Sequence, residues 1–307
     1  MGGGDTMRST CVTTDAETAP ARGTVRICLE LAKPRLTALV AATAGAGYVL
    51  GGAAPGYGWP LFWTLLGTAL AAGGANAVNQ WLEAGRDGRM ERTRGRPFAR
   101  GRLGLLRGFA WTIGVIAVGV AILGVGVNWR AGALAALAAA IYLFLYTPLK
   151  VRNSLCTLVG AVSGAIPPMI GWVAASGRLD PGAWMLGGLL YAWQVPHFLS
   201  LAWLHRSDYE KGGFLMLATS DPSGRATCRM ALLYTAALLP LSLMPSLGGI
   251  AGPTYAVGAI LCGAGMLVLA VRLHRRRADA DAGRLFRASL AYLPLVLALM
   301  MADRRPG

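Results

Sequence analysis

Nine blocks of apolar residues, most of them long enough to cross a lipid bilayer, limit what this chain can fold into. Hydrophobic residues make up 55% of the 307 positions and charged residues only 14%, whereas soluble domains carry about 25% charged residues. A spanning helix needs about 20 mostly apolar residues, because lipid offers no partners to free backbone groups. The sequence therefore predicts an all-α, polytopic membrane protein with nine transmembrane helices. The blocks cover residues 36–54, 60–81, 105–127, 129–147, 155–175, 183–204, 229–249, 251–272 and 285–302.

The basic residues lie mainly in the connections between these blocks. The chain has 29 Lys and Arg residues against 14 Asp and Glu, a formal net charge of +15. If successive blocks cross in alternate directions, 25 of those 29 basic residues fall on one side of the membrane. Basic loops stay on the cytoplasmic side, so the N-terminus is predicted to be cytoplasmic and the C-terminus to lie outside. Because membrane topology accounts for the charge, we expect no nucleic acid as a partner.

The segment before the first block is polar and mixed in charge, and it has no apolar core. We therefore predict a disordered cytoplasmic tail over residues 1–26 and no cleavable signal peptide. A single transmembrane domain is expected over residues 27–303. The five cysteines are scattered without a CxxC pair, which argues against a disulfide framework or a zinc site.

An amide and two carboxylates occur four residues apart where the second block ends. Asn79, Glu83 and Asp87 would share one face of a helix. Carboxylates suit Mg²⁺, which often completes its coordination with substrate phosphate oxygens, and arginine suits the remaining phosphate charge. The pattern favours a diphosphate site beside hydrocarbon over a solvated helix end with anchoring arginines. The arginines that follow closely are Arg86, Arg89, Arg92, Arg94 and Arg96.

A second polar segment ends the fourth block on the same side. Pro148 should stop the helix, and Lys150 would then either reach back to a phosphate or extend to the membrane surface as an anchor. The two interpretations are equally favoured. The block that follows contains three glycines and two prolines between Gly160 and Gly171, which predicts a closely packed, interrupted helix beside a cavity.

A histidine lies inside the sixth apolar block. His197 follows Pro196, and ionisable groups within membrane segments are functional candidates, although a packing role is the simpler alternative. Asp208 lies eleven positions further on, which is three helical turns, so the two side chains would share a face if the helix continued.

These motifs together resemble the UbiA-type intramembrane prenyltransferases. The resemblance covers roughly residues 27–302. The Met-x-Arg-Thr-x-x-Arg-Pro stretch that begins at Met90 is similar to the heme O synthase branch of that family. Further matching segments are Lys33-Pro34-Arg35, Tyr146-Thr-Pro-Leu-Lys150, Leu158 to Trp172, Trp193-Gln-Val-Pro-His-Phe-Leu199, Asp208-Tyr209, Gly212-Gly213, and Arg284 to Tyr292.

The resemblance implies helices around a central cavity, and transfer of a farnesyl group from farnesyl diphosphate to a vinyl group of protoheme (heme B), giving heme O. It implies Mg²⁺, with Mn²⁺ as an alternative, held by Glu83 and Asp87 with Asn79 orienting it. Heme is then a substrate, not a cofactor. His197 and Asp208 complete the expected catalytic set. Diphosphate contacts are expected from Arg92, Arg96, Lys150 and Lys211, and heme or prenyl contacts from Tyr146, Trp193, His197 and Phe198.

Two positions depart from the superfamily pattern. Position 83 is Glu where Asp is usual, and His197 stands where aromatic prenyltransferases begin a second Asp-rich cluster. The sequence leaves three contacts open for His197: heme iron, a heme propionate, or the water that quenches a cation. Other functions remain as alternatives: prenylation of an aromatic acceptor such as a quinone precursor or chlorin, and transport of a small solute or heme.

The resemblance and the charge asymmetry also predict a location. We expect a multi-pass protein of a bacterial inner membrane, with its active site facing the cytoplasm. A heme A synthase or oxidase assembly proteins are expected to act downstream of it.

Overall fold

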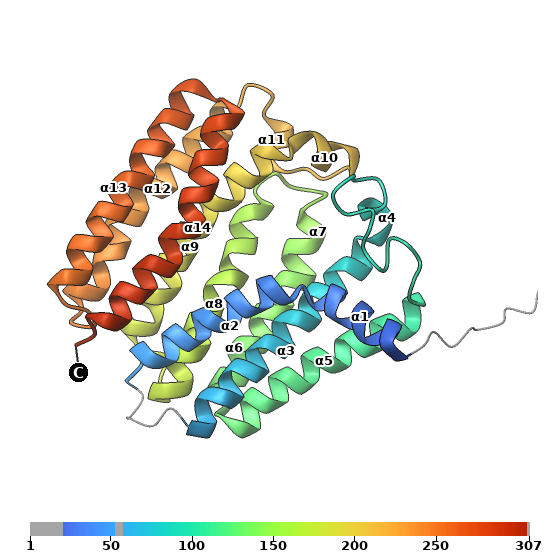
Figure 1. Cartoon of the computed structure of the whole chain (residues 1–307), viewed down its shortest axis with the longest axis horizontal. Coiled ribbons are helices and arrows are strands. Elements are labelled where there is room, and N and C mark those ends of the chain that lie inside the picture. The colour runs from blue at the N-terminus through green and yellow to red at the C-terminus, as the bar shows by residue number, and fades with distance from the viewer. Residues whose placement is uncertain (1–20, 53–57, 306–307) are drawn as a thin grey trace, which may run out of the picture.

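Helices make up nearly all of the computed structural model, which describes residues 21–52 and 58–305. Each apolar block identified in the sequence contains a long helix, and Figure 1 shows these helices side by side in one bundle. The long helices are α2 (Pro34–Leu50), α3 (Gly58–Leu82), α5 (Leu105–Gly126), α6 (Trp129–Ala140), α8 (Cys156–Ser176), α9 (Pro181–Leu204), α12 (Arg225–Leu247), α13 (Pro253–Arg276) and α14 (Asp279–Ala302).

The all-α prediction is confirmed, and the protein is a multi-pass membrane protein. Within the described ranges, seven helical segments are long and apolar enough to cross a membrane. Helix α2, with 17 residues, and helix α9 are not among these seven. The count of nine membrane crossings therefore stays a prediction.

A helix precedes the first apolar block, and the boundaries expected for the tail and the domain stay predictions. Helix α1 spans Ala21–Ala32, so it begins before the expected domain start at residue 27. The remainder of the predicted tail, residues 1–20, lies outside the described residues. Lys33 separates α1 from α2 with a left-handed backbone (φ 50°), and Pro34 opens α2 at its first position, where proline is well tolerated.

Helices α2 and α8 cross with their backbones in direct contact. A Cβ atom on Gly47 would overlap the carbonyl oxygen of Pro168, and one on Gly171 would overlap the carbonyl oxygen of Ala44. Small residues allow such close approach in membranes, where packing rather than the hydrophobic effect drives helix association. The prolines Pro167 and Pro168 lie within α8, whose helix continues through them from Cys156 to Ser176. The predicted interruption of this helix is therefore wrong.

The helix of the fourth block changes from an α-helix to a π-helix near the polar end of the bundle. Helix α6 continues as the π-helix η1 (Ile141–Tyr146) and then α7 (Thr147–Leu149). Pro148 has no N–H to donate, and the hydroxyl of Thr147 donates to the carbonyl of Tyr142 at 2.8 Å. Wider turns of this kind often mark functional sites. Here the turn brings the rings of Tyr142 and Tyr146 to a centroid distance of 5.4 Å.

Three short helices cover the same end of the bundle. These are α4 (Ala84–Asp87), α10 (Arg206–Lys211) and α11 (Leu217–Ser220), and they lie near one another in Figure 1. They belong to loops that contain acidic and basic residues, and the fold gathers these loops at one end of the bundle.

Candidate active site

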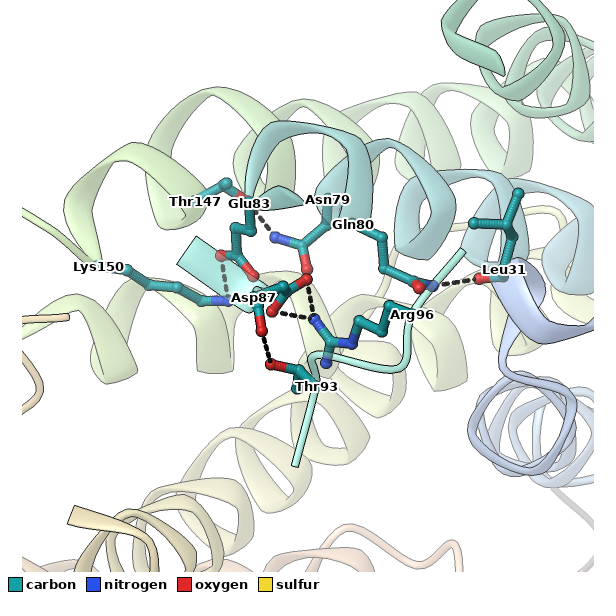
Figure 2. A network of polar contacts seen from close by, with 9 residues as sticks. All are labelled: Leu31, Asn79, Gln80, Glu83, Asp87, Thr93, Arg96, Thr147 and Lys150. Carbon is teal, nitrogen blue, oxygen red and sulfur yellow. Dashed lines mark hydrogen bonds and ion pairs between the residues drawn. The ribbon is translucent and has the colours of Figure 1, made fainter. Parts of the chain in front are cut away.

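The first sequence motif forms a buried acidic cluster at the end of α3. Asn79 and Glu83 are 2% and 5% exposed, and Asp87 is fully buried. The backbone N–H of Glu83 still donates to the Asn79 carbonyl, and that of Asp87 to the Glu83 carbonyl. These bonds continue across the break at Glu83 between α3 and α4, and the three side chains lie together as their spacing predicts (Figure 2).

Each carboxylate of this cluster is paired with one cation. The ammonium Nζ of Lys150 lies 2.8 Å from Glu83 Oε1, and one guanidinium nitrogen of Arg96 lies 2.7 and 2.6 Å from the two oxygens of Asp87 (Figure 2). The Asn79 amide donates to the Thr147 hydroxyl at 3.1 Å, which ties the end of α3 to α7.

The cation partners decide the protonation of Glu83. Burial alone would raise the pKa of this carboxyl, but the charge and hydrogen bond of Lys150, helped by Asn79 and Arg96, hold the pKa below its ordinary value. Glu83 is therefore ionised at neutral pH and available as an oxygen ligand.

A polar cavity of about 160 Å³ opens beside this cluster. Four cations line it, and Lys150 also lies over the ring of Tyr146, 4.5 Å from its centroid. Several positive charges around a small space favour a multiply charged anion. The lining residues are Lys33, Asn79, Glu83, Met90, Arg92, Arg96, Tyr142, Tyr146, Lys150, Tyr209 and Phe214.

The cavity includes one cation that the sequence did not assign to the site and omits one that it did. Lys33 lines the cavity, whereas Lys211 is exposed at the end of α10 and does not. Placing Lys211 among the diphosphate contacts receives no support from this geometry. Lys33 belongs to the segment Lys33-Pro34-Arg35 of the family resemblance. The sequence feature that indicates its position is Pro34, which forces a turn at this end of the bundle.

The charge of Lys33 depends on what occupies the cavity. Burial, with Arg96 and Lys150 nearby, lowers the pKa of Lys33 to about 7. A bound diphosphate would favour the charged ammonium and raise this pKa. Diphosphate binding is therefore strongest below pH 7, where Lys33 is already charged. Binding weakens as pH rises above 7, because Lys33 must then take up a proton.

We therefore expect diphosphate binding at pH 8 to be accompanied by proton uptake. Calorimetric titration with farnesyl diphosphate in two buffers of different ionisation enthalpy would measure the uptake. Lys33→Arg keeps the charge at all these pH values and should abolish most of the uptake while retaining affinity. Equal uptake in the variant and the parent would assign the proton to another group.

Asp208 holds a loop rather than facing the cavity. Its two carboxylate oxygens accept from the backbone N–H groups of Glu91 and Arg92, at 2.9 and 3.4 Å. The guanidinium of Arg92 lies 5.8 Å from the Tyr209 ring centroid. Asp208 therefore links α10 to the loop that follows α4. Asp208 is absent from the lining of the polar cavity.

A shared face for His197 and Asp208 was expected only if the helix continued between them, and this condition is not met. Helix α9 ends at Leu204 and α10 begins at Arg206. The Arg206 guanidinium donates to the Trp203 carbonyl at 2.7 Å, which satisfies a backbone acceptor at this helix end.

His197 is part of α9, and its side chain faces α14. Its Nδ1 atom is 2.8 Å from the Ser289 hydroxyl, which itself donates to the Phe286 carbonyl at 2.7 Å. With the Ser289 proton directed to the Phe286 carbonyl, Nδ1 of His197 is the donor and Nε2 keeps its lone pair. The imidazole is stacked on Trp193 and Phe286, with centroid distances of 5.0 and 4.9 Å.

A second, largely apolar cavity of about 260 Å³ extends into the bundle. It shares Tyr142 and Tyr146 with the polar cavity, so the two spaces are adjacent. Phe198 lines the apolar cavity, whereas Trp193 and His197 do not. The other lining residues are Leu36, Val40, Thr68, Ala71, Ala72, Ala75, Asn76, Ala135, Ala138, Ala139, Gly160, Ser163, Gly164, Pro167, Ile170 and Gln194.

Comparison with known proteins identifies the class. The family model of the UbiA prenyltransferases matches residues 38–293, and the chain belongs to this family. The chain is thus a prenyltransferase, and its two adjoining cavities are consistent with that class.

Individual relatives agree with this assignment. The protoheme IX farnesyltransferase of Solibacter usitatus (strain Ellin6076) is 41% identical over 293 residues, covering 92% of this chain and all of the relative. A solved digeranylgeranylglyceryl phosphate synthase superposes with a TM-score of 0.78 at 14% identity, over 92% of this chain and 98% of that one. A UbiA homolog from Archaeoglobus fulgidus, solved with GPP and Mg²⁺, gives 0.64 at 12% identity, over 89% and 99%. The two structures show the common fold.

Proposed function

We propose that this chain transfers the farnesyl group of farnesyl diphosphate to a vinyl group of protoheme, giving heme O. One observation carries the proposal: a cation-lined cavity and an apolar cavity meet at Tyr142 and Tyr146. A diphosphate with a long hydrocarbon tail needs this pairing of environments. The name of the Solibacter relative, which matches over nearly the whole chain, supports heme as the acceptor.

The buried acidic cluster fits a divalent cation. Two carboxylates and an amide offer hard oxygen donors, and Mg²⁺ is commonly held by one or two carboxylates together with substrate phosphates. Within the described ranges, no group of three or more His, Cys, Asp or Glu residues forms a metal site, and phosphate oxygens and water would fill the remaining coordination positions. Glu83 and Asp87 would hold Mg²⁺ or Mn²⁺, oriented by Asn79. The ion supplies positive charge against the departing diphosphate.

The cations of the polar cavity would bind the phosphate oxygens. Arg96 is engaged with both oxygens of Asp87, and a metal ion at Asp87 would release Arg96 towards the substrate. Lys33, Arg92 and Lys150 line the same space. These fixed charges stabilise the leaving group as its charge develops.

The residues between the two cavities would surround the reacting carbon. The Tyr146 ring offers a π-face to the allylic cation, and the apolar walls exclude bulk water from the tail. The vinyl π-electrons then form the new carbon–carbon bond, and water adds to the cation left beside the porphyrin ring.

The decisive experiment uses membranes that contain the protein. Incubation with heme, farnesyl diphosphate and Mg²⁺ should yield heme O, detected by mass spectrometry, and omission of either substrate should remove the product. Prenylation of a quinone precursor or chlorin with no heme O would favour the aromatic-acceptor alternative. Absence of any prenylated product would favour a transporter.

His197 is expected to serve the heme rather than the prenyl donor. Its free Nε2 lone pair can ligate iron or accept a hydrogen bond. We expect His197→Ala to raise the heme concentration needed for half-maximal turnover about tenfold, the value of one polar contact. Binding of farnesyl diphosphate should stay unchanged. Heme titrations of turnover and calorimetry with the diphosphate measure the two effects.

A matched control for His197 is available in His205. This residue caps the end of α9 and lines neither cavity, so His205→Ala should leave the heme dependence in place. Unchanged heme O formation in His197→Ala would assign His197 a packing role between α9 and α14.

We also propose the location and the partners that the sequence indicated. The basic loops would face the cytoplasm of a bacterium from its inner membrane, and the polar cavity would then lie near the cytoplasmic surface. Heme O would pass to a heme A synthase or to oxidase assembly proteins. Reporter fusions after Arg100 and after residue 305 should show opposite sides of the membrane.

A further inference from the structure

Two polar side chains in the wall of the apolar cavity, Thr68 and Asn76, have no hydrogen-bond partner among the described residues. Thr68 Oγ1 is buried and has no hydrogen-bond partner. Asn76 is 6% exposed, and its amide makes no hydrogen bond with any described residue. Polar groups left unpaired inside a membrane protein are costly and commonly functional. A hydrocarbon tail alone would leave these polar groups without hydrogen bonds, so they favour a polar occupant of the cavity.

The amide of Gln194 is oriented by the fold. Its Nε2 donates to the carbonyls of Leu190 and Ala161, at 3.1 and 3.4 Å. Both protons of this nitrogen are therefore used within the protein, and no described residue donates to Oε1. The residue is 5% exposed and lines the cavity. An acceptor oxygen with fixed orientation thus faces a space with apolar walls.

Gly164 makes room for this oxygen close to the reacting end. A Cβ at position 164 would overlap Gln194 Oε1, while a Cβ at Gly160 would lie 2.7 Å from the Tyr146 ring. Positions 160 and 164 are one turn apart on α8, about 6 Å along the axis. The Gln194 carbonyl therefore lies about one helical turn from Tyr146, the ring shared with the diphosphate cavity.

The chemistry of the site selects the occupant. Heme propionates are anionic and would require cations, which line the other cavity. A neutral molecule small enough to remain beside a prenyl chain, and able to donate to an amide oxygen, is water. The described wall offers a further polar contact for it at Asn76.

We propose that Gln194 holds the water molecule that adds to the carbocation on the heme side chain; this rests on the proposed farnesyl transfer. The C1–O bond of farnesyl diphosphate breaks, and diphosphate leaves with the electron pair. The terminal vinyl carbon bonds to C1, which leaves a cation on the vinyl carbon attached to the ring. A lone pair of the water forms the C–O bond. The released proton goes to the departed diphosphate, and no oxidant or reductant is needed.

Removing the acceptor should change the product rather than only the rate. Without a held water, the cation loses a proton from its neighbouring CH₂ group, which gives an alkene lighter than heme O by one water. For Gln194→Leu we expect the alkene share of the heme products to rise about tenfold, the factor for one lost hydrogen bond. Mass spectrometry of extracted hemes gives both products from one sample.

Two further variants keep this test decisive. Gly164→Ala leaves Gln194 in the chain but displaces its oxygen, and should also raise the alkene share. Thr157→Val removes a buried, unpartnered hydroxyl of α8 that lines neither cavity, and should leave the product ratio unchanged. If Gln194→Leu cannot be purified as a monodisperse protein, Gly164→Ala decides the outcome.

Each remaining outcome has one meaning. An unchanged ratio in Gln194→Leu or, failing that protein, in Gly164→Ala overturns the assignment of the water. Complete loss of transfer in a folded Gln194→Leu variant also overturns it, because the residue would then act before the cation forms. If the parent protein makes no farnesylated heme at all, the proposed function fails instead.

Discussion

Asp87→Asn is expected to reduce heme O formation by about 10³-fold, the scale on which removal of a single transition-state charge contact lowers turnover. Asp87 is fully buried and accepts two hydrogen bonds from Arg96. The amide keeps the size of the side chain but removes the negative charge that would hold a divalent ion. Turnover of purified protein as a function of Mg²⁺ concentration measures the effect.

The control for this variant lies on the same end of the bundle. Lys211→Ala removes an exposed charge that lines neither cavity, so its turnover should stay within about twofold of the parent, as for surface substitutions generally. The Asp87→Asn protein must elute as a monodisperse species in detergent. Near-normal heme O production by that folded protein would remove Asp87 from the metal site.

The sequence was sufficient where the determining pattern is local. Apolar blocks predict helices because each must satisfy its own backbone within lipid. Likewise, the spacing of Asn79, Glu83 and Asp87 predicts a shared face, and the i to i+4 backbone hydrogen bonds from α3 through Glu83 to α4 keep the three side chains together. The family membership, already indicated by these motifs, is confirmed by the comparison over residues 38–293.

The sequence was insufficient where the determining contact is distant. Lys150 pairs with Glu83 across 67 positions, and no local pattern distinguishes such a lysine from a surface anchor. Lys33 was not assigned to the site for the same reason. The sixth block was predicted to end at residue 204, but the sequence did not decide whether the helix continues to Asp208, because neither glycine nor proline marks the break and the Arg206 side chain satisfies the helix end.

The crossing of α2 and α8 also requires glycine at particular positions, and the sequence alone does not identify these positions. Glycine is common throughout this chain, with 42 residues, so composition does not identify which glycines are essential. At Gly171 the neighbour is the backbone of Ala44 and Tyr48, which cannot rotate away as a side chain can. Along α8 this contact also fixes the positions of Gly160 and Gly164 beside the cavities.

We therefore expect Gly171→Ala to destabilise the protein by about 3 kcal/mol, in the range for overpacked sites. The added methyl group would force α2 and α8 apart and would forfeit dispersion contacts along both helices. Thermal unfolding in detergent should show Tm lowered by on the order of 10 °C. Gly265→Ala on α13 provides the control, because a Cβ there meets no atom within 4 Å and alanine favours the helix by about 1 kcal/mol. Equal melting temperatures for the two variants would show that α2 and α8 separate without cost.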